Sequence, residues 1–228
     1  MKKAVSRLIS ALFPETLKSW SEYRYWKKRR EAEGDLSNDH YSWFYTGHFG
    51  LDKGFYENKK VLDIGCGPRG SLEWAGHAAR RVGLDPLADR YLKLGADRHE
   101  MEYVASGSEE IPFPDGMFDI VTAFNSLDHV SDIGQTIREI KRVTAQDGLF
   151  LLLVEINCEP THCEPHTVGP EITEQFKPEF ECVDKRVFEP VKEGLYESIR
   201  QDVERAEPEW GKSPAWLSAK FVRLGQGT

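Results

Sequence analysis

From Lys60 onward, the sequence alternates short apolar segments with segments whose apolar residues recur at helical spacing. This alternation is typical of a parallel sheet whose strands are joined by crossover helices. The run L-F-L-L-L-V, residues 149–154, is apolar throughout, as expected for a central strand covered on both faces. The length of 228 residues suits one such domain with a modest extension. We therefore predict an α/β fold with a mostly parallel sheet.

Turn-forming residues and periodicity divide this part of the chain into elements. The predicted strands number seven and cover residues 61–64, 81–84, 103–105, 118–124, 149–154, 180–188 and 215–224. The predicted helices cover residues 71–79, 87–94, 133–143 and 171–177. The sequence contains no internal repeat and no low-complexity tract.

The first predicted strand runs into a glycine-rich turn, V-L-D-I-G-C-G-P-R-G, residues 61–70. Ligands of open parallel sheets bind at the carboxyl ends of the strands. Gly65 and Gly67 have no Cβ, so the backbone can approach a ligand, and the predicted helix from Ser71 would point its positive end toward it. The spacing G-x-G-x-x-G suits either a dinucleotide or S-adenosylmethionine.

Two carboxylates help to separate these ligands. Asp85 follows the second strand, where it can accept hydrogen bonds from ribose hydroxyls of either cofactor. Asp63 stands two residues before Gly65, where it would repel a pyrophosphate but attract the ammonium group of a methionine moiety. At about 4 Å and an effective dielectric near 20, that term is on the order of 4 kcal/mol before desolvation. Asp63 therefore favours the sulfonium cofactor.

Several motifs in this order resemble class I S-adenosylmethionine-dependent methyltransferases, especially the ubiquinone/menaquinone-biosynthesis type. They lie between about residues 60 and 157 and read V-L-D-I-G-C-G-P, G-L-D-P, S-E-E-I-P-F-P-D-G-M-F-D-I-V, L-D-H-V-S-D and I-R-E-I-K-R-V-T-A-Q-D-G. The resemblance implies a Rossmann-like seven-stranded sheet with helices on both faces and S-adenosyl-L-methionine as cofactor. The family's K-P-G-G turn is here A-Q-D-G, which we expect to be a surface turn.

The resemblance also assigns cofactor contacts to residues of this chain. It places the methionine end at Asp63, Gly65, Cys66 and Gly67, the ribose at Asp85 and Pro86, the adenine turn at Ser108 and Glu109, and the floor of the site at Asn125. Where the family often has Asp or Asn before the adenine turn, this chain has Gly107. The adenine amino group must then be bound by Ser108, by backbone or by water.

Methyl transfer mainly requires alignment, but a hydroxyl acceptor also needs a base. His129 is the best candidate, because imidazole titrates near neutral pH and the residue follows the fourth strand. Asp128 beside it is a candidate substrate contact. A structural role for His129, paired with Asp128 or Asp132, is the alternative.

The segment E-I-N-C-E-P-T-H-C-E-P-H, residues 155–166, should overhang the acceptor pocket. Glu155 is a candidate substrate contact, and His162 and His166 are candidate acids or bases. Its Cys/His spacing matches no standard zinc finger, so we predict no metal. A plain surface loop remains the alternative.

The sequence predicts two regions, with residues 1–50 as a basic, aromatic helical extension and residues 51–228 as the methyltransferase domain. Leu8, Ile9, Leu12 and Phe13 recur at helical spacing beside basic residues. Tyr41, Trp43 and Tyr45 stand where many members of this fold place a lid. Packing of these rings on the sheet is the alternative.

Charge is distributed unevenly along the chain. Residues 1–30 contain nine Lys or Arg against Glu15 and Glu22, whereas the whole chain has a net charge of −8. The acidic body argues against nucleic-acid binding, and the basic segment predicts at most weak contact with an anionic membrane surface. Residues 8–13 are too short for a secretory core or a membrane span, and four scattered cysteines are typical of reduced thiols. We expect a cytoplasmic protein, with peripheral membrane attachment as an option; the oligomeric state is not indicated.

The function predicted from these features is S-adenosylmethionine-dependent methyl transfer to a small molecule, with oxygen as the favoured acceptor atom. A sugar, glycolipid or natural-product intermediate is the favoured substrate class. Two alternatives stay open: an NAD(P)-dependent oxidoreductase, and a catalytically silent cofactor-binding or scaffold protein.

Overall fold

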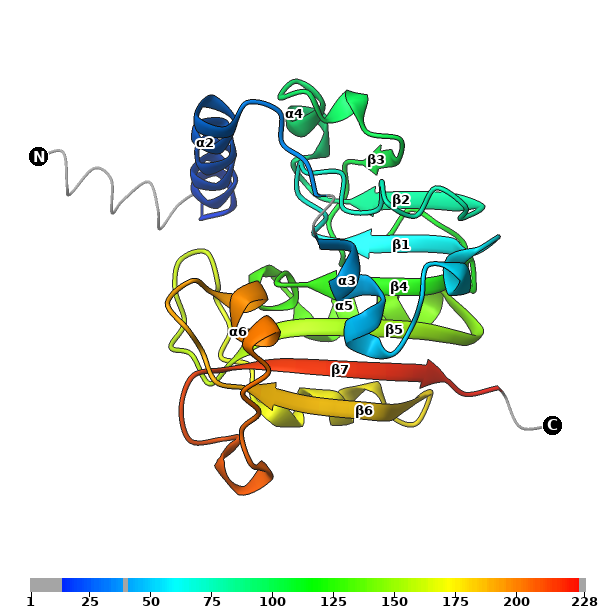
Figure 1. The fold of residues 1–228 in the computed structure, drawn as a ribbon, viewed down its shortest axis with the longest axis vertical. Helices are drawn as coiled ribbons and strands as arrows, with labels where there is room; N and C mark the ends of the chain where they lie inside the picture. The colour runs from blue at the N-terminus through cyan, green and yellow to red at the C-terminus, as the bar shows by residue number, and fades with distance from the viewer. Residues whose placement is uncertain (1–13, 39–40, 226–228) are drawn as a thin grey trace, which may run out of the picture.

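The computed structural model describes residues 14–38 and 41–225. The predicted basic helix around Leu8 to Phe13 lies outside these residues. The described part contains one sheet of seven strands in the order β3-β2-β1-β4-β5-β7-β6 (Figure 1). All neighbouring strands are parallel except β7, which is antiparallel to both β5 and β6. The predicted α/β fold with a mostly parallel sheet is confirmed.

The strands are β1 (Lys60–Ile64), β2 (Arg80–Leu84), β3 (Glu102–Val104), β4 (Phe118–Phe124), β5 (Thr144–Ile156), β6 (Phe180–Phe188) and β7 (Ala215–Arg223). The α-helices are α2 (Pro14–Glu33), α3 (Ser42–Tyr45), α4 (Ala88–Leu92), α5 (Ile133–Val143) and α6 (Leu195–Gln201). The 3₁₀ helices are η2 (Gly47–Phe49), η3 (Gly54–Tyr56), η4 (Ala96–Arg98), η5 (Leu127–His129), η6 (Pro170–Phe176) and η7 (Glu207–Glu209).

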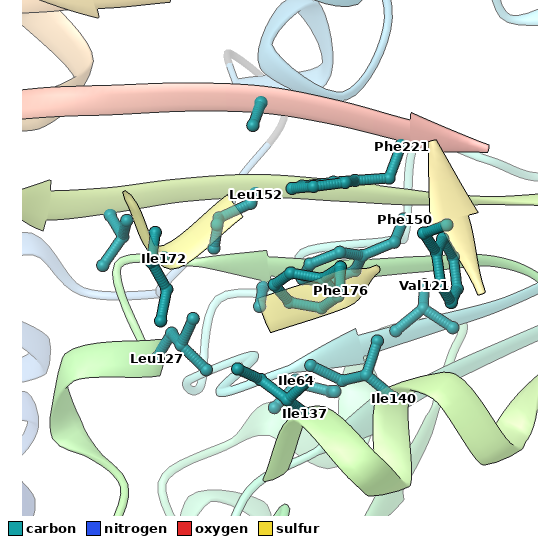
Figure 2. Close-up of a cluster of buried hydrophobic side chains, with 14 of the residues drawn as sticks. Ile64, Val121, Leu127, Ile137, Ile140, Phe150, Leu152, Ile172, Phe176 and Phe221 are labelled. Carbon is teal, nitrogen blue, oxygen red and sulfur yellow. The ribbon is translucent and has the colours of Figure 1, made fainter. Parts of the chain in front are cut away.

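Strand β5 shows how the sequence fills both faces of the sheet. Its side chains alternate, so that Phe150 and Leu152 join the cluster under α5 and η6, whereas Leu151 and Leu153 join the cluster under α3 and α6. In the first cluster, Phe150 stacks on Phe176 with ring centroids 4.9 Å apart (Figure 2). A fully apolar strand is therefore required here, because neither face meets water.

The segment between β1 and β2 differs from the expected helix 71–79. It forms consecutive turns closed by bonds such as Glu73 N–H to Gly70 O and Ala75 N–H to Leu72 O, each three residues apart. The side chain of Leu72 is fully buried in the cluster that also contacts Trp74. Packing of these two side chains favours turns over a regular helix in a segment that Gly70 and Gly76 interrupt. No helix dipole therefore points at the glycine loop from this segment.

The expected surface turn A-Q-D-G, residues 145–148, is a bulge within β5. Thr144 lies opposite Phe118 of β4, yet Leu149 lies opposite Ile120, so extra residues are accommodated on β5. Asp147 has a left-handed φ of 57° in this bulge. The bulge leaves the pairing of the buried part of β5 intact.

Helix α2 stands beyond the carboxyl ends of β1 and β4 (Figure 1). Its Tyr23 and Trp26 pack against Leu87 and Tyr91, which belong to the small cluster around α4. In the described part of the chain, no helix combines the length and the apolar character needed to cross a membrane.

Candidate active site

The glycine loop after β1 is shaped by its contacts with the neighbouring strand end. Gly65 has a φ of 72°, and a Cβ on it would lie 2.3 Å from the Cβ of Ser126, which follows β4. The Ser126 hydroxyl donates to the Ile64 carbonyl across 2.8 Å. Gly65 is thus required by the protein's own packing as well as by its left-handed conformation.

Asp63 is a buried carboxylate directly below this loop. Its Oδ1 accepts a hydrogen bond from Thr122 at 2.5 Å, and its Oδ2 accepts one from the Tyr45 hydroxyl at 3.3 Å. Burial raises the pKa of Asp63 to about 6, and these hydrogen bonds oppose the rise. Because burial disfavours the ionised carboxylate, a cation bound beside Asp63 would stabilise its charge.

Asp85 lies at the matching position after β2. Its Oδ1 accepts from the Leu87 N–H at 2.8 Å and its Oδ2 from the Gly67 N–H at 3.2 Å. Burial and, after it, the nearby charge of Glu22 raise the pKa of Asp85 to about 7, although the two backbone hydrogen bonds oppose the rise. Asp85 thus joins the glycine loop to the end of β2, and two buried carboxylates flank the loop.

Helix α2 covers this part of the site. Its Glu22 accepts from the Tyr91 hydroxyl at 3.1 Å, and a Cβ on Gly67 would lie 3.4 Å from the Trp26 ring. One turn earlier, the Lys18 ammonium donates to the carbonyl of His129. A single helix therefore touches both the cofactor loop and the segment after β4.

The remaining predicted cofactor contacts lie at several depths. Cys66 is buried against β2, where a Cβ on Gly83 would lie 2.6 Å from its Sγ, and burial raises its thiol pKa. Pro86 is exposed. Asn125 is exposed directly after β4, with a left-handed φ of 53°.

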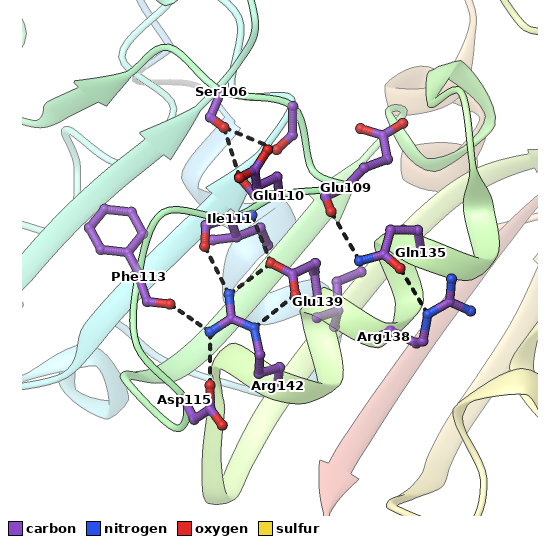
Figure 3. A network of polar contacts seen from close by, with 12 residues as sticks. Ser106, Glu109, Glu110, Ile111, Phe113, Asp115, Gln135, Arg138, Glu139 and Arg142 are labelled. Carbon is purple, nitrogen blue, oxygen red and sulfur yellow. Dashed lines mark hydrogen bonds and ion pairs between the residues drawn. The ribbon is translucent and has the colours of Figure 1, made fainter.

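Ser108 and Glu109 are tied to the start of α5. The Ser108 hydroxyl lies 2.9 Å from the Thr136 hydroxyl, and Glu109 Oε1 accepts from the Ser131 N–H at 2.7 Å. Arg142, on the same helix, holds the rest of this loop through the carbonyls of Ile111 and Phe113 (Figure 3). The loop that carries the predicted adenine turn is therefore fixed by α5.

His129 ends η5, at the carboxyl end of β4. Its Nε2 lies 3.7 Å from Glu164 Oε1, and both side chains are about one-third exposed. Asp128 beside it is buried, its Oδ1 accepts no hydrogen bond in the part of the chain that the structure describes, and burial raises its pKa. The negative charges of Glu155 and Glu164 also raise the pKa of Asp128. These three carboxylates and His129 therefore lie close enough to interact electrostatically, and we call them the acidic group around His129.

The candidate residues of the segment 155–166 lie in different environments. His166 Nε2 lies 2.9 Å from the Val130 carbonyl oxygen, and the ring lines a cavity of about 400 Å³ beside the start of α5. His162 is exposed. Burial, followed by a hydrogen bond with Glu155, raises the pKa of Cys158 to about 12, so this thiol stays protonated at neutral pH. Among the described residues, no three His, Cys, Asp or Glu side chains are arranged to hold a metal ion.

The aromatic patch before β1 packs on the sheet. Tyr45 is buried among Trp74 and Phe124, with ring centroids 5.7 and 4.5 Å away. The rings of Tyr41 and Tyr196 of α6 are tilted against each other with centroids 4.4 Å apart, and Trp43 is 43% exposed. Of the three, Tyr45 reaches the candidate site directly, through Asp63.

Five residues that contribute to the site were not singled out from the sequence: Lys18, Glu22, Thr122, Ser126 and Glu164. Thr122 could have been noticed in the sequence, since it is a polar residue in the buried part of the predicted strand 118–124, between Val121 and Ala123. Glu164 lay within a loop that was noted for its histidines. The sequence contained no such indication for Lys18 and Glu22 of α2, because no local pattern specifies where that helix packs on the domain.

Strand order, a glycine loop after β1 and an acidic residue after β2 together define a class I methyltransferase fold. Residues 62–152 match a family model described as a methyltransferase domain. The fold, this match and the motifs together support a class I, S-adenosylmethionine-dependent methyltransferase, as the sequence predicted.

Individual relatives agree with this assignment. The chain is 33% identical to the uncharacterized methyltransferase YcgJ of Bacillus subtilis over 109 residues, 41% of this chain and 40% of that protein. It is 33% identical to the demethylmenaquinone methyltransferase of Listeria welshimeri over 100 residues, 39% of this chain and 41% of that protein. It thus spans about 40% of the length of these curated relatives.

The crystal structure of the YcgJ protein from Bacillus subtilis matches with a TM-score of 0.56. The match covers 78% of this chain and 99% of that chain at 17% sequence identity, which is a likeness of fold.

Proposed function

We propose that this protein transfers a methyl group from S-adenosylmethionine to an oxygen atom of a small-molecule acceptor. The family supports the cofactor and the reaction type. The observation that carries the choice of oxygen is the proximity of His129 to Glu164 at the carboxyl end of β4. An alcohol must lose its proton during methylation, and this pair can remove it.

The residues around the glycine loop fit the cofactor. Two buried carboxylates, Asp63 and Asp85, match a cationic methionine end and a ribose with two hydroxyl donors. Gly65 and Gly67 give the loop its left-handed turn, with φ values of 72° and 57° that other residues rarely adopt. In this proposal the adenine lies near Ser108 and Glu109, and Cys66, Pro86 and Asn125 line the remaining edges.

When bound, S-adenosylmethionine supplies a methyl group on a positively charged sulfur. The protein has to hold the acceptor oxygen in line and accept its proton. The His129 imidazole takes that proton, and Glu164, whose Oε1 lies 3.7 Å from Nε2, stabilises the imidazolium that results. Lys18 donates to the backbone carbonyl of His129, which fixes the residue's position.

We further propose that the acceptor is a hydroxyl-rich compound, such as a sugar, a glycolipid or a natural-product intermediate. The support is the acidic group around His129. Asp128 has a buried oxygen that accepts no hydrogen bond from the described residues, and Glu155 and Glu164 are partly exposed beside it. Carboxylate oxygens are acceptors, so hydroxyl donors on a substrate would satisfy them.

Neither alternative function has an observation in its favour. An oxidoreductase would have to place a pyrophosphate beside Asp63, against the sign of its charge. A silent scaffold would leave the buried, unsatisfied oxygen of Asp128 without a purpose.

The experiment combines binding with a transfer assay. Calorimetry should detect S-adenosylhomocysteine and no NAD. S-adenosylmethionine labelled on its methyl carbon, incubated with a panel of sugars and a glycolipid extract, should give methyl ethers identified by mass spectrometry. His129→Gln should lower the transfer rate by roughly 10²–10⁴-fold while leaving affinity for S-adenosylhomocysteine unchanged.

His77→Gln is the matched control, because His77 is exposed in the turns between β1 and β2 and the Asn58 N–H binds its carbonyl at the amino end of β1. It should retain full activity. His162→Gln and His166→Gln test the other predicted bases. Label on nitrogen or carbon, or an unchanged rate in His129→Gln, would refute the proposed oxygen chemistry.

A further inference from the structure

Helix α2 has two faces with different chemistry. Its inner face, with Glu22, Tyr23 and Trp26, packs on α4 and the glycine loop. Residues that follow one another by three or four positions lie on the same side of a helix. Trp20, Arg24, Lys27 and Lys28 have this spacing and are all exposed, with Tyr25 at their margin. We call these five residues the outer face of α2.

The outer face combines aromatic and cationic groups in water. Trp20 is 52% exposed and Tyr25 is 55% exposed, both high values for such large rings. The Arg24 guanidinium lies 4.4 Å from the Trp20 ring centroid. Arg29, by contrast, pairs with Glu33 at 2.5 Å, and the acidic Glu22 turns inward to Tyr91. The positive charge of the helix is therefore concentrated on the side that faces away from the domain.

We propose that the outer face of α2 docks on an anionic lipid surface. Lysine and arginine side chains are attracted to such a surface by about 1 kcal/mol each, and tryptophan and tyrosine prefer the boundary between lipid and water. Glu31, exposed on the same side, reduces this attraction but does not reverse it. In the sequence, Lys2, Lys3 and Arg7 precede the helix and add charge of the same sign.

The rest of the molecule favours one orientation on such a surface. The whole chain has a net charge of −8 although its first thirty residues are strongly basic, so other faces are repelled by anionic lipid. The contact is peripheral, in line with the absence of a membrane-crossing helix among residues 14–38 and 41–225. The docked helix would also touch the glycine loop and His129, through Trp26 and Lys18. This inference does not depend on the proposed methyl transfer.

The test is sedimentation of the full chain with vesicles. Vesicles of phosphatidylcholine with phosphatidylglycerol should bind the protein, vesicles of phosphatidylcholine alone should not, and added salt should weaken the binding. Lys28→Glu should reduce the partition coefficient at least about fivefold, the equivalent of 1 kcal/mol. Trp20→Ala should reduce it as well.

Two matched controls lie at η3, which precedes the amino end of β1, whereas α2 lies beyond its carboxyl end. Lys53→Glu makes the same charge change at an exposed site, and Phe55→Ala removes an exposed ring of 39% accessibility. Both should bind anionic vesicles like the unaltered protein. Binding of S-adenosylhomocysteine should be equal in all four variants, which separates loss of docking from loss of the cofactor site.

Two outcomes would overturn the proposal. One is equal sedimentation with neutral and anionic vesicles. The other is anionic binding that falls as much in Lys53→Glu as in Lys28→Glu, since net charge alone would then explain it.

Discussion

The Thr122 hydroxyl donates a hydrogen bond of 2.5 Å to Asp63 Oδ1, and the two residues lie opposite each other in the parallel register of β4 and β1. Asp63 was assigned from the sequence to the methionine end of the cofactor. Its partner comes from a strand almost sixty residues away. The Asp63 carboxylate is therefore held in place by sheet pairing.

Replacement of Thr122 by valine should weaken cofactor binding through the ionisation of Asp63. Valine keeps the shape of threonine but removes the hydrogen bond that favours the ionised carboxylate, so the pKa of Asp63 should rise above about 6. The free energy of unfolding should fall by about 1–3 kcal/mol. Affinity for S-adenosylhomocysteine should fall most near neutral pH, as measured by calorimetry at several pH values.

Thr144→Val is a suitable control for this change. Thr144 is also fully buried, but its hydroxyl donates to the Ile140 carbonyl at 2.6 Å. It should lose comparable stability with no pH-dependent change in affinity. If Thr122→Val and Thr144→Val behaved alike in the titrations, the hydrogen bond to Asp63 would have no role in binding.

The two glycines of the loop should respond differently to alanine. A Cβ on Gly65 would lie 2.3 Å from Ser126 Cβ, whereas a Cβ on Gly67 would lie 3.4 Å from the Trp26 ring. Both have left-handed φ values, which cost about 1–2 kcal/mol for alanine. In urea denaturation, Gly65→Ala should lower the free energy of unfolding by roughly another 1–3 kcal/mol, because the new side chain overpacks against Ser126.

A second substitution tests the cause. Ser126→Gly removes the atom that a new side chain on Gly65 would meet. The double variant Gly65→Ala/Ser126→Gly should therefore be more stable than the sum of the single effects predicts. Additive losses would mean that the clash with Ser126 is not the reason for glycine at this position.

The fold could be predicted because its signals are local. The expected bounds of β4, β6 and α5 agree with the structure, since apolar periodicity and flanking turn residues mark them directly. The helix expected over residues 71–79 was wrong. Leu72 and Trp74 are held by tertiary packing in a segment interrupted by glycines. A prediction from local helix propensity does not include that packing.

The site could be predicted in part, for a similar reason. Asp63 is the last residue but one of β1 and Asp85 directly follows β2, so their positions could be predicted from the sequence. Thr122 and Glu164 reach the site through strand register and loop folding, which no local pattern encodes. The position of α2 depends on contacts with α4, more than sixty residues away. That α2 covers the glycine loop could therefore be seen only in the structure.

Arg142 should control the loop that carries the predicted adenine turn. Its guanidinium donates to the carbonyls of Ile111 and Phe113 and pairs with Glu139 at 2.7 Å (Figure 3). Lysine cannot make this set of bonds, because it lacks the planar fork of five donors. Arg142→Lys should lower the free energy of unfolding by about 2 kcal/mol and weaken binding of S-adenosylhomocysteine.

Arg138→Lys is the control on the same helix. The Arg138 side chain is exposed and bonds to Gln135 at 2.9 Å, so its replacement should change stability by less than about 0.5 kcal/mol. Equal effects of the two substitutions, measured by urea denaturation, would argue against a special role for Arg142.

The stability of the cofactor-free protein should decrease as pH rises from about 4 to about 7. Asp85 has a pKa of about 7 in the folded chain, above the ordinary 3.8, because it is buried and lies near Glu22. The folded state therefore binds this proton more tightly than the unfolded state does. That contribution is complete below pH 4, is lost as pH rises through about 7, and amounts to at most about 4 kcal/mol.

Glu22→Gln should reduce this pH dependence, because the neutral amide no longer repels the Asp85 carboxylate while it can still bond to the Tyr91 hydroxyl. Urea denaturation at pH 5 and pH 8 measures the difference directly. Glu31→Gln, on the exposed side of the same helix, should leave the difference unchanged. A pH dependence that is the same in Glu22→Gln and the unaltered protein would mean that α2 does not set the protonation of Asp85.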